Sequence, residues 1–433
     1  MIITGISAIF GGGLEGKEVT LRGWVYRHRT SGNMVFAVVR DPSGVIQVAI
    51  KKDKVGEKDW KAANDAYVES SLVVRGTVRK DERAPGGFEI QASGFELVSR
   101  GEPFPIAKDL SEEFLLDIRH LWVRSQKMTA IMKSRHLIVN YLREFFDTEG
   151  FYEIAPPIIT KSGCEGGSTL FEMDYFGDKA YLTQSSQMYA EVFIFALGKV
   201  YVLAPSFRAE KSRTVRHLAE YWHLEPEMAF YDQKMNMELQ ERMVEYGVQK
   251  MVREHPELLK ACGRDPLDLE GVKVPFDRMD YARAVDRVNE LGGRMEHGQD
   301  FGADEEAILT KEAKKPLFVH NFPKDIKAFY MREDPNKPGT VLNADLLAPA
   351  GHGEIIGGSE RIWEYDELIA RMKEQGLDKF MADYQWYVDL RKYGSVPHSG
   401  FGLGVERYVK WMLNLDHIRD AIPFPRTITR CYP

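Results

Sequence analysis

The stretch FRAEKSRTVRHLAEYWHLEPEMAF, residues 207–230, is the part of the chain around which the rest is organised. An apolar run at 200–203 leads into it, residues 211–216 are polar and charged, and residues 221–230 alternate. This pattern predicts two strands joined by a charged loop. Arg208 falls inside the first strand, where a lone buried charge costs too much without a partner. An anionic ligand would be a natural partner, so the hairpin indicates a phosphate site, although such clusters are more often solvated loops.

Composition describes an ordinary globular chain. It has 433 residues, 44% of them hydrophobic and 28% charged, which is enough for two or three domains. Three widely spaced cysteines fit neither a disulfide framework nor a thiolate metal cluster. No stretch is apolar enough to span a bilayer, and the N-terminus has no basic start, so we expect a cytoplasmic protein without a membrane partner. The net charge of −7 argues mildly against a nucleic-acid coat protein but allows a local basic face.

Residues 18–100 alternate in short runs separated by glycine and proline. The runs predict five strands and one helix, at 19–26, 34–40, 45–50, 58–67 (the helix), 72–78 and 88–91. This order favours a small OB barrel, although another small β-domain would fit. Phe36, with Arg27 and Gln47 nearby in sequence, is a candidate for stacking and reading a single-stranded base. Phe36 could equally be a core residue, as strand aromatics usually are.

The middle of the chain predicts a linker followed by a long helix. Residues 101–125 contain Pro103 and Pro105, and apolar residues then recur at helical spacing until Gly150. By default such a helix belongs to the core. No repeated βαβ unit and no Walker-type phosphate loop follows, which argues against kinases and P-loop ligases.

Two further segments carry polar side chains suited to ligands. Glu165, Ser185 and Gln187 supply acceptors for an ammonium group near glycines that let a ligand approach the backbone, or they belong to a plain turn and a helix cap. Asp345 and Glu354 fall on neighbouring predicted strands. They are either a surface pair or hard oxygen ligands of the kind that Mg²⁺ prefers.

Three segments in order carry a family resemblance: FYEIAPP at 151–157, FRAE with RHLAEYWHLEPE at 207–227, and GFGLGVERYVKWML at 400–413. They resemble motifs 1, 2 and 3 of the class II aminoacyl-tRNA synthetases, in the subclass for aspartate, asparagine and lysine. Three motifs in the right order are far more specific than one.

The resemblance implies an α+β fold in three parts. An N-terminal OB-fold β-barrel at 1–103 would bind the anticodon, residues 104–130 would be a hinge, and residues 131–433 would form the class II catalytic domain, an antiparallel sheet flanked by helices. It also implies a homodimer through the helix at 125–150 and the following strand with Pro157.

The same resemblance assigns roles to single residues. The catalytic residues are Arg208, Glu210 and Arg407, with Arg208 on the α-phosphate of ATP. The ATP-binding residues are Arg208, Glu210, Arg216, His217, Leu218, Tyr221, Glu354, Gly404 and Arg407, and Asp345 and Glu354 carry Mg²⁺. The amino-acid-binding residues are Glu165, Ser185, Gln187, Glu225 and Arg391. The anticodon-binding residues are Arg27, Phe36, Gln47 and Glu89.

Two positions distinguish a binding pocket for asparagine from one for aspartate. Ala190 stands where aspartyl enzymes carry a lysine, and Glu225 stands where they carry an aspartate. A substrate carboxylate near Glu225 would meet a like charge, whereas an amide NH₂ would find an acceptor, with Arg391 on the amide oxygen. Over essentially its whole length the chain resembles the asparaginyl-tRNA synthetases of archaea and eukaryotes, which activate L-asparagine with ATP and charge tRNA(Asn).

Three other functions stay open at this point. An aspartyl-tRNA synthetase, discriminating or not, would share the motifs, and Ala190 and Glu225 count against it. A synthetase-like enzyme that makes free asparagine would not need the barrel. A catalytically silent nucleic-acid-binding paralogue would not need the full set of predicted ATP residues.

Overall fold

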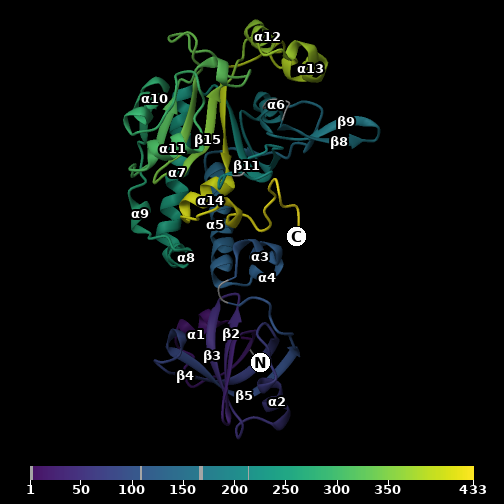
Figure 1. Cartoon of the computed structure of the whole chain (residues 1–433), viewed down its shortest axis with the longest axis vertical. Helices are drawn as coiled ribbons and strands as arrows, with labels where there is room; N and C mark the ends of the chain where they lie inside the picture. The colour runs from purple at the N-terminus through teal and green to yellow at the C-terminus, as the bar shows by residue number, and fades with distance from the viewer. Residues whose placement is uncertain (1–2, 108–109, 165–168, 213) are drawn as a thin grey trace. The chain divides into compact units, whose positions relative to one another are not determined.

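The computed structural model describes residues 3–107, 110–164, 169–212 and 214–433. The chain forms two compact units, which divide between Leu115 and Leu116. This division falls within helix α3 (Glu112–Asp117), inside the segment that we expected to be a hinge. Figure 1 shows both units. None of the helices in the described ranges is long and apolar enough to cross a membrane.

The N-terminal unit is a closed barrel in the order β1-β2-β3-β5-β4 in the described residues. Its strands are β1 (Glu18–Ser31), β2 (Met34–Asp41), β3 (Gly44–Lys51), β4 (Ser71–Lys80) and β5 (Phe88–Ser99), and its helices are α1 (Ile6–Phe10) and α2 (Glu57–Asn64). The five predicted strands and the helix are therefore confirmed, although β1 and β5 run further than predicted and α2 ends earlier. The barrel closes tightly because Gly23 and Gly76 have no side chain; a Cβ on either would collide with a backbone carbonyl of the next strand.

The barrel interior follows the period of two expected for half-buried strands. On β2, Val35, Ala37 and Val39 are fully buried, and the residues between them are only partly buried. Phe36 is one of the latter and does not belong to the barrel core, so the alternative that it is a core residue is wrong.

The second unit is built on a large sheet in the order β12-β13-β14-β15-β16-β11-β10-β6, as far as the residues are described. Its strands are β6 (Tyr152–Glu153), β10 (Lys199–Phe207), β11 (Glu220–Ala229), β12 (Asp277–Asp280), β13 (Leu317–His320), β14 (Asn343–Ala348), β15 (Gly353–Glu360) and β16 (His398–Gly404). All interior pairs are antiparallel, as predicted, but both edge pairs, β12 with β13 and β10 with β6, are parallel. The charged loop between β10 and β11 is also where the sequence predicted it.

Within the described residues, the second unit also contains a smaller sheet, with the strand order β7-β9-β8. Its strands are β7 (Ile159–Thr160), β8 (Phe171–Tyr175) and β9 (Asp178–Leu182). The expected motif 1 strand is shorter than predicted: β6 ends at Glu153, and Pro157 lies in the connection to β7. A proline has no N–H to donate to a ladder, which is a physical reason for the early end.

The first helix that lies wholly in the second unit is the short α4 (Arg119–Trp122), and further helices follow it. They are α5 (Gln126–Thr148), α6 (Gln187–Leu197), α7 (Gln233–Glu254), α8 (Pro256–Cys262), α9 (Leu267–Glu270), α10 (Tyr281–Glu290), α11 (Ala303–Thr310), α12 (Tyr365–Glu374), α13 (Met381–Asp389) and α14 (Val405–Met412). The long helix predicted at 125–150 is α5, and its N-cap is Ser125, whose side chain accepts from the N–H of Met128.

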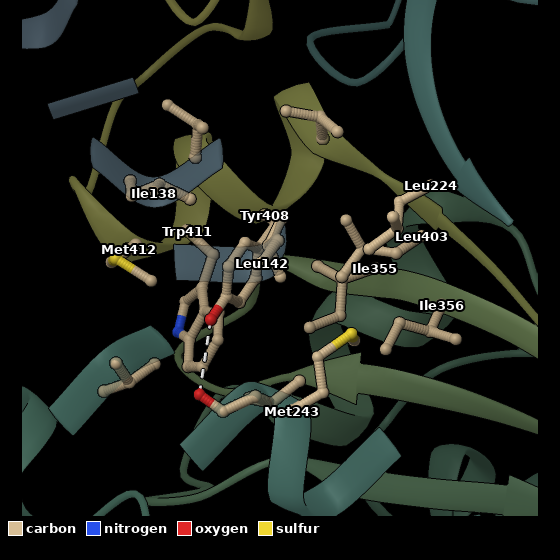
Figure 2. Packing of buried hydrophobic residues seen from close by; sticks show 14 of the residues in the cluster. Ile138, Leu142, Leu224, Met243, Ile355, Ile356, Leu403, Tyr408, Trp411 and Met412 are labelled. Atoms are coloured by element: carbon tan, nitrogen blue, oxygen red, sulfur yellow. Dashed lines mark hydrogen bonds between the residues drawn. The ribbon is translucent and has the colours of Figure 1, made fainter. Parts of the chain in front are cut away.

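Helices α5, α7 and α14 pack on one face of the large sheet and form its core (Figure 2). Ile138 and Leu142 come from α5, Met243 from α7, and Tyr408 and Trp411 from α14. They meet the strand residues Leu224, Ile355, Ile356 and Leu403. The buried hydroxyl of Tyr408 donates to the carbonyl of Val244 at 3.2 Å, whereas the buried Nε1 of Trp411 has no hydrogen-bond partner among the described residues. The core therefore occupies one face of β11, β15 and β16 and leaves the other face for polar side chains.

Candidate active site

Neighbouring strands β11 and β16 place a polar face opposite the core. Because side chains alternate along a strand, Leu224 and Met228 on β11 enter the core, whereas His223, Glu225 and Glu227 point the other way. On β16 the residues facing them, such as Gly400 and Gly402, have no side chain. A Cβ on Gly400 would collide with the Glu227 carboxylate, and one on Gly402 with the His223 ring. The glycines thus make room for the polar residues of β11.

Two adjoining cavities open over this face. The larger one, of about 420 Å³, is lined by six of the predicted site residues: Ser185, Gln187, Arg208, Glu225, Asp345 and Glu354. The smaller one, of about 70 Å³, is lined by eight of them: Arg208, Arg216, His217, Leu218, Tyr221, Glu354, Gly404 and Arg407. Arg208 and Glu354 line both cavities, so these two residues lie where the two sets meet.

Glu225 lies in the wall of the larger cavity and is held by neutral donors. Its carboxylate accepts from the N–H of Ser186 at 2.8 Å and from the hydroxyl of Ser185. The His223 Nδ1 atom lies 3.3 Å from it. Gln187 is fixed nearby, because its amide donates to Glu191 at 2.9 Å. The wall therefore presents a carboxylate acceptor in a fixed orientation.

An arginine that sequence analysis missed lines the same cavity. The Arg361 guanidinium, 3% exposed, donates to Glu227 at 2.5 Å and to the Ser359 hydroxyl at 2.7 Å. Burial and the neighbouring carboxylates raise the pKa of Glu227 to about 8, against the attraction of Arg361. The signal in the sequence was an arginine two residues after the Gly-Gly-Ser run at 357–359, just past the end of β15.

Asp345 and Glu354 converge from neighbouring strands. A Cβ placed on Gly357 would lie 3.5 Å from Asp345 Oδ1 and 3.2 Å from Glu354 Oε1, so the two carboxylates flank this glycine. The Lys327 ammonium lies 2.9 Å from Asp345, and Arg407 Nη1 lies 2.7 Å from Glu354. The prediction that the two carboxylates occupy neighbouring strands is confirmed.

The two carboxyl groups differ in their pKa. Burial raises the pKa of Asp345 to about 7, because the attraction of Lys327 is opposed by the charge of Glu354. Burial would also raise the pKa of Glu354, but Arg407, Arg216 and Lys327 hold it at about 2. In the described part of the chain, no three His, Cys, Asp or Glu side chains are grouped to hold a metal ion, so a cation here would need oxygens from a ligand as well.

A face of the barrel strands carries a second set of predicted residues, of which Glu89 is buried. Residues paired across strands share a face, and the pairs Arg27–Val38, Val38–Gln47 and Gln47–Glu89 run across four strands. Phe36, two residues before Val38, lies on that same face, with the Arg29 guanidinium 4.6 Å from its ring centre. Gln47 donates to Glu89 at 3.1 Å. The four predicted anticodon residues therefore share one face.

Comparison with known proteins agrees with this geometry. The family model for tRNA synthetases class II (D, K and N) matches residues 111–428, and that for the OB-fold nucleic acid binding domain matches residues 19–98. Asparagine–tRNA ligases of Thermoplasma acidophilum and Thermococcus gammatolerans are 49% and 50% identical, over 96% and 97% of this chain and 97% of each relative. The chain belongs to the class II tRNA synthetases, among the asparagine–tRNA ligases.

Solved structures agree with this placement of the synthetase. The asparaginyl-tRNA synthetase of Pyrococcus horikoshii, complexed with asparaginyl-adenylate, has a TM-score of 0.94 and 48% identity, over 97% of both chains. The corresponding synthetase of Entamoeba histolytica with the same adenylate has a TM-score of 0.89 and 37% identity, over the whole of both chains.

Arg391 of this synthetase is not where the sequence analysis expected it. Its guanidinium, with a fully buried side chain, lies 2.6 Å from Glu191 and donates to the carbonyl of Ile362 at 3.0 Å. It is not among the described residues that line either cavity. A buried arginine needs a carboxylate, and Glu191 takes Arg391 away from the ligand space. Arg361, rather than Arg391, lines the larger cavity.

The predicted residues Glu210, His217 and Tyr221 of the synthetase lie on or near the smaller cavity. Glu210 lies 3.8 Å from His217 Nε2 and is not among the described residues lining the cavities. Burial and the charge of Arg407 lower the pKa of His217. The Arg208 guanidinium lies 5.7 Å from the centre of the Tyr221 ring, and Arg407 lines the same cavity. Glu165 lies outside the described residues.

Proposed function

We propose that this synthetase activates L-asparagine with ATP, giving asparaginyl-adenylate and pyrophosphate, and then transfers asparagine to tRNA(Asn). One observation carries the choice of amino acid: Glu225, in the wall of the larger cavity, is held by the Ser185 hydroxyl, the Ser186 N–H and His223, and no arginine or lysine of the described residues pairs with it. It accepts from the side-chain NH₂ of asparagine, and Arg361 donates to the amide oxygen.

Aspartate is rejected by charge. Its side-chain carboxylate would lie against Glu225, and like charges in a closed site cost several kcal/mol. Aspartyl enzymes carry a lysine at the position of Ala190, and here Ala190 is fully buried among Ile194, Val200 and Val202. No added cation therefore stands at this position to offset the repulsion.

Adenylate formation needs positioning rather than a general base. The carboxylate of asparagine is already ionised near neutral pH and attacks the α-phosphorus of ATP, with pyrophosphate leaving. Arg208 lines both cavities, so it is placed to bind the α-phosphate between the amino acid and the nucleotide. Tyr221 and Arg407, in the smaller cavity, flank the adenine, and Glu210 and His217 support the ATP.

The carboxylates of Asp345 and Glu354 fit a hard cation. Their oxygens flank Gly357, whose missing side chain leaves the space between them open. Two carboxylates together with phosphate oxygens are the donor set that Mg²⁺ takes in nucleotide sites. When bound, Mg²⁺ neutralises charge on the ATP phosphates. Lys327 holds Asp345 in place and limits its repulsion from Glu354.

In this proposal, tRNA binds at the barrel and a second copy of the chain binds at the motif 1 region. The face with Phe36, Gln47 and Glu89 stacks and reads anticodon bases, with Arg27 at its edge. A homodimer and a cytoplasmic location complete the proposal. Exposed apolar side chains near the segment of Pro157, including Tyr152 at 58% exposure and Ile159 at 40%, support a buried interface there.

The test is ATP–pyrophosphate exchange with asparagine and aspartate in parallel, on wild type, Glu225→Gln and Glu238→Gln. Glu238 is an exposed carboxylate on α7 and serves as the control. Wild type should exchange with asparagine only. Glu225→Gln should lose about tenfold to a hundredfold in kcat/KM for asparagine and discriminate less against aspartate, because a buried acceptor worth about 1–3 kcal/mol is changed.

Three results would contradict the proposal. Equal exchange with aspartate in wild type would point to an aspartyl enzyme. No exchange with either amino acid would point to a silent nucleic-acid-binding protein. Unchanged discrimination in Glu225→Gln would mean that another group reads the side chain.

A further inference from the structure

Helix α11 brings a carboxylate to the place where the two cavities meet. Glu306 is 5% exposed, and its Oε2 atom lies 2.6 Å from Arg216 Nη1 and accepts from the N–H of Glu354 at 2.6 Å. It also lines the larger cavity. A carboxylate beside a site for a triphosphate repels the ligand unless it serves another group there. The position of Glu306 is therefore favourable only if its charge acts on another group at this site.

Arg216 is the group on which the charge of Glu306 acts. It is 8% exposed, lines the smaller cavity and forms its ion pair to Glu306 through one end of the guanidinium. Within the described residues, its Nε atom is buried and has no hydrogen-bond partner. A buried donor without an acceptor is costly, and an oxygen of an anionic ligand would supply the acceptor.

The backbone is shaped to hold this ion pair. Gly353, at the start of β15, has a φ of +74°, a conformation that favours glycine. A Cβ at this position would collide with both the Arg216 guanidinium and the Glu306 carboxylate. The pair thus packs directly on the main chain, one residue before Glu354.

We propose that Glu306 is a positioning residue, which holds Arg216 toward the phosphates of ATP and ties the charged β10–β11 loop to the start of β15. This inference rests on the proposed function and extends it to a helix outside the three motifs. Through the N–H of Glu354, the same carboxylate fixes the strand segment that carries one of the two proposed Mg²⁺ ligands. Glu306 acts on the phosphate end of the nucleotide and makes no contact with the amino acid.

The main test compares Glu306→Gln with Asp304→Asn. Asp304 is an exposed carboxylate on the same helix, so the control removes the same charge without the ion pair. ATP–pyrophosphate exchange is measured while ATP, pyrophosphate and asparagine are varied in turn. We expect the KM values for ATP and pyrophosphate to rise about tenfold or more in Glu306→Gln, as for a broken buried charge pair, with the KM for asparagine within about twofold of wild type. Asp304→Asn should match wild type.

The alternative is that Glu306 only anchors α11. In that case Glu306→Gln would raise the KM values for ATP and asparagine together and lower the melting temperature, and this result would overturn the proposal. An unchanged KM for ATP would overturn it as well.

A double variant tests whether Glu306 acts through Arg216. If it does, Glu306→Gln together with Arg216→Ala should bind ATP no more weakly than Arg216→Ala alone. Fully additive losses would contradict the proposal. ATP affinity is also measured directly by equilibrium dialysis. A wild type that binds ATP but shows no exchange would refute the proposed function, while the dialysis values would still decide the role of Glu306.

Discussion

At the scale of single residues, the site is defined by how its buried charges are paired. Glu191 takes Arg391, and Glu227 takes Arg361, in ion pairs of 2.6 and 2.5 Å. Glu225 is held by a hydroxyl and a backbone N–H instead. Because isolated buried charges are too costly, each arginine is fixed before any ligand arrives. The carboxylate without an arginine of its own is the one best placed to accept from a substrate.

The Glu191–Arg391 pair should stabilise the fold. Burial alone would raise the pKa of Glu191, but Arg391 and His398 outweigh it and hold the pKa well below 4.5. A lowered pKa means that the stabilisation is fully present above pH 4.5 and is lost as the pH falls below that value. Glu191→Gln should therefore lower the free energy of unfolding at pH 7 by about 3–5 kcal/mol, the usual cost of breaking a buried pair.

Urea unfolding at pH 7 and at pH 4 measures this. The difference between wild type and Glu191→Gln should be smaller at pH 4. The control is Asp389→Asn, which removes a solvent-accessible partner of Lys392 and should leave stability close to that of wild type. Equal stability of wild type and Glu191→Gln at pH 7 would show that the pair is not stabilising.

At the scale of elements, strand β16 shows how a local pattern creates a site. Glycine at alternate positions 400, 402 and 404 leaves one face of the strand bare. The polar side chains of β11 fill part of that space, and the rest forms the two cavities. The opposite face carries Phe401 and Leu403 into the core.

Gly402→Ala should damage both binding functions. The added methyl group would overlap the His223 ring, which lies beside Glu225, and Gly402 lines both cavities. We expect the KM values for ATP and asparagine to rise about tenfold and stability to fall by about 1–3 kcal/mol, as is typical of overpacking. Exchange kinetics and thermal unfolding measure these effects. Gly271→Ala, in open space, is the control, and identical behaviour of the two variants would contradict the role of the bare face.

The elements could be predicted from sequence because their signals are local. Period-two runs gave the barrel strands and the β10–β11 hairpin, and helical spacing with Ser125 and Gly150 gave α5. Local signals could not show that Arg361, rather than Arg391, lines the larger cavity. Both arginines follow plausible strand or helix segments, and only the fold shows which of them pairs with Glu191. Glu306 was missed for the same reason. It is one of several acids in a charged helix, and its burial depends on a strand about 50 residues later.

At the scale of the whole molecule, the two units have separate cores. The barrel core is formed by residues from Ile6 to Phe95, and the main core of the second unit begins at Met128. The face with Phe36 and both cavities belong to different units. Under the proposed function, each unit carries one of the two recognition tasks, and damage to the barrel surface should leave the chemistry of the first step intact.

Phe36→Ala tests this separation. Stacking of a base on an aromatic ring is worth about 1–3 kcal/mol, so the KM for tRNA in aminoacylation should rise roughly tenfold to a hundredfold. ATP–pyrophosphate exchange without tRNA should stay at the wild-type rate, because Phe36 is outside the barrel core and far in sequence from every cavity residue. Tyr67→Ala is the matched control, since Tyr67 is an aromatic residue of the same unit that lies under Arg100, as Phe36 lies under Arg29. Loss of exchange in Phe36→Ala would mean that the barrel supports the first step. An equal rise of the KM for tRNA in Phe36→Ala and Tyr67→Ala would mean that the barrel face with Phe36 does not read bases.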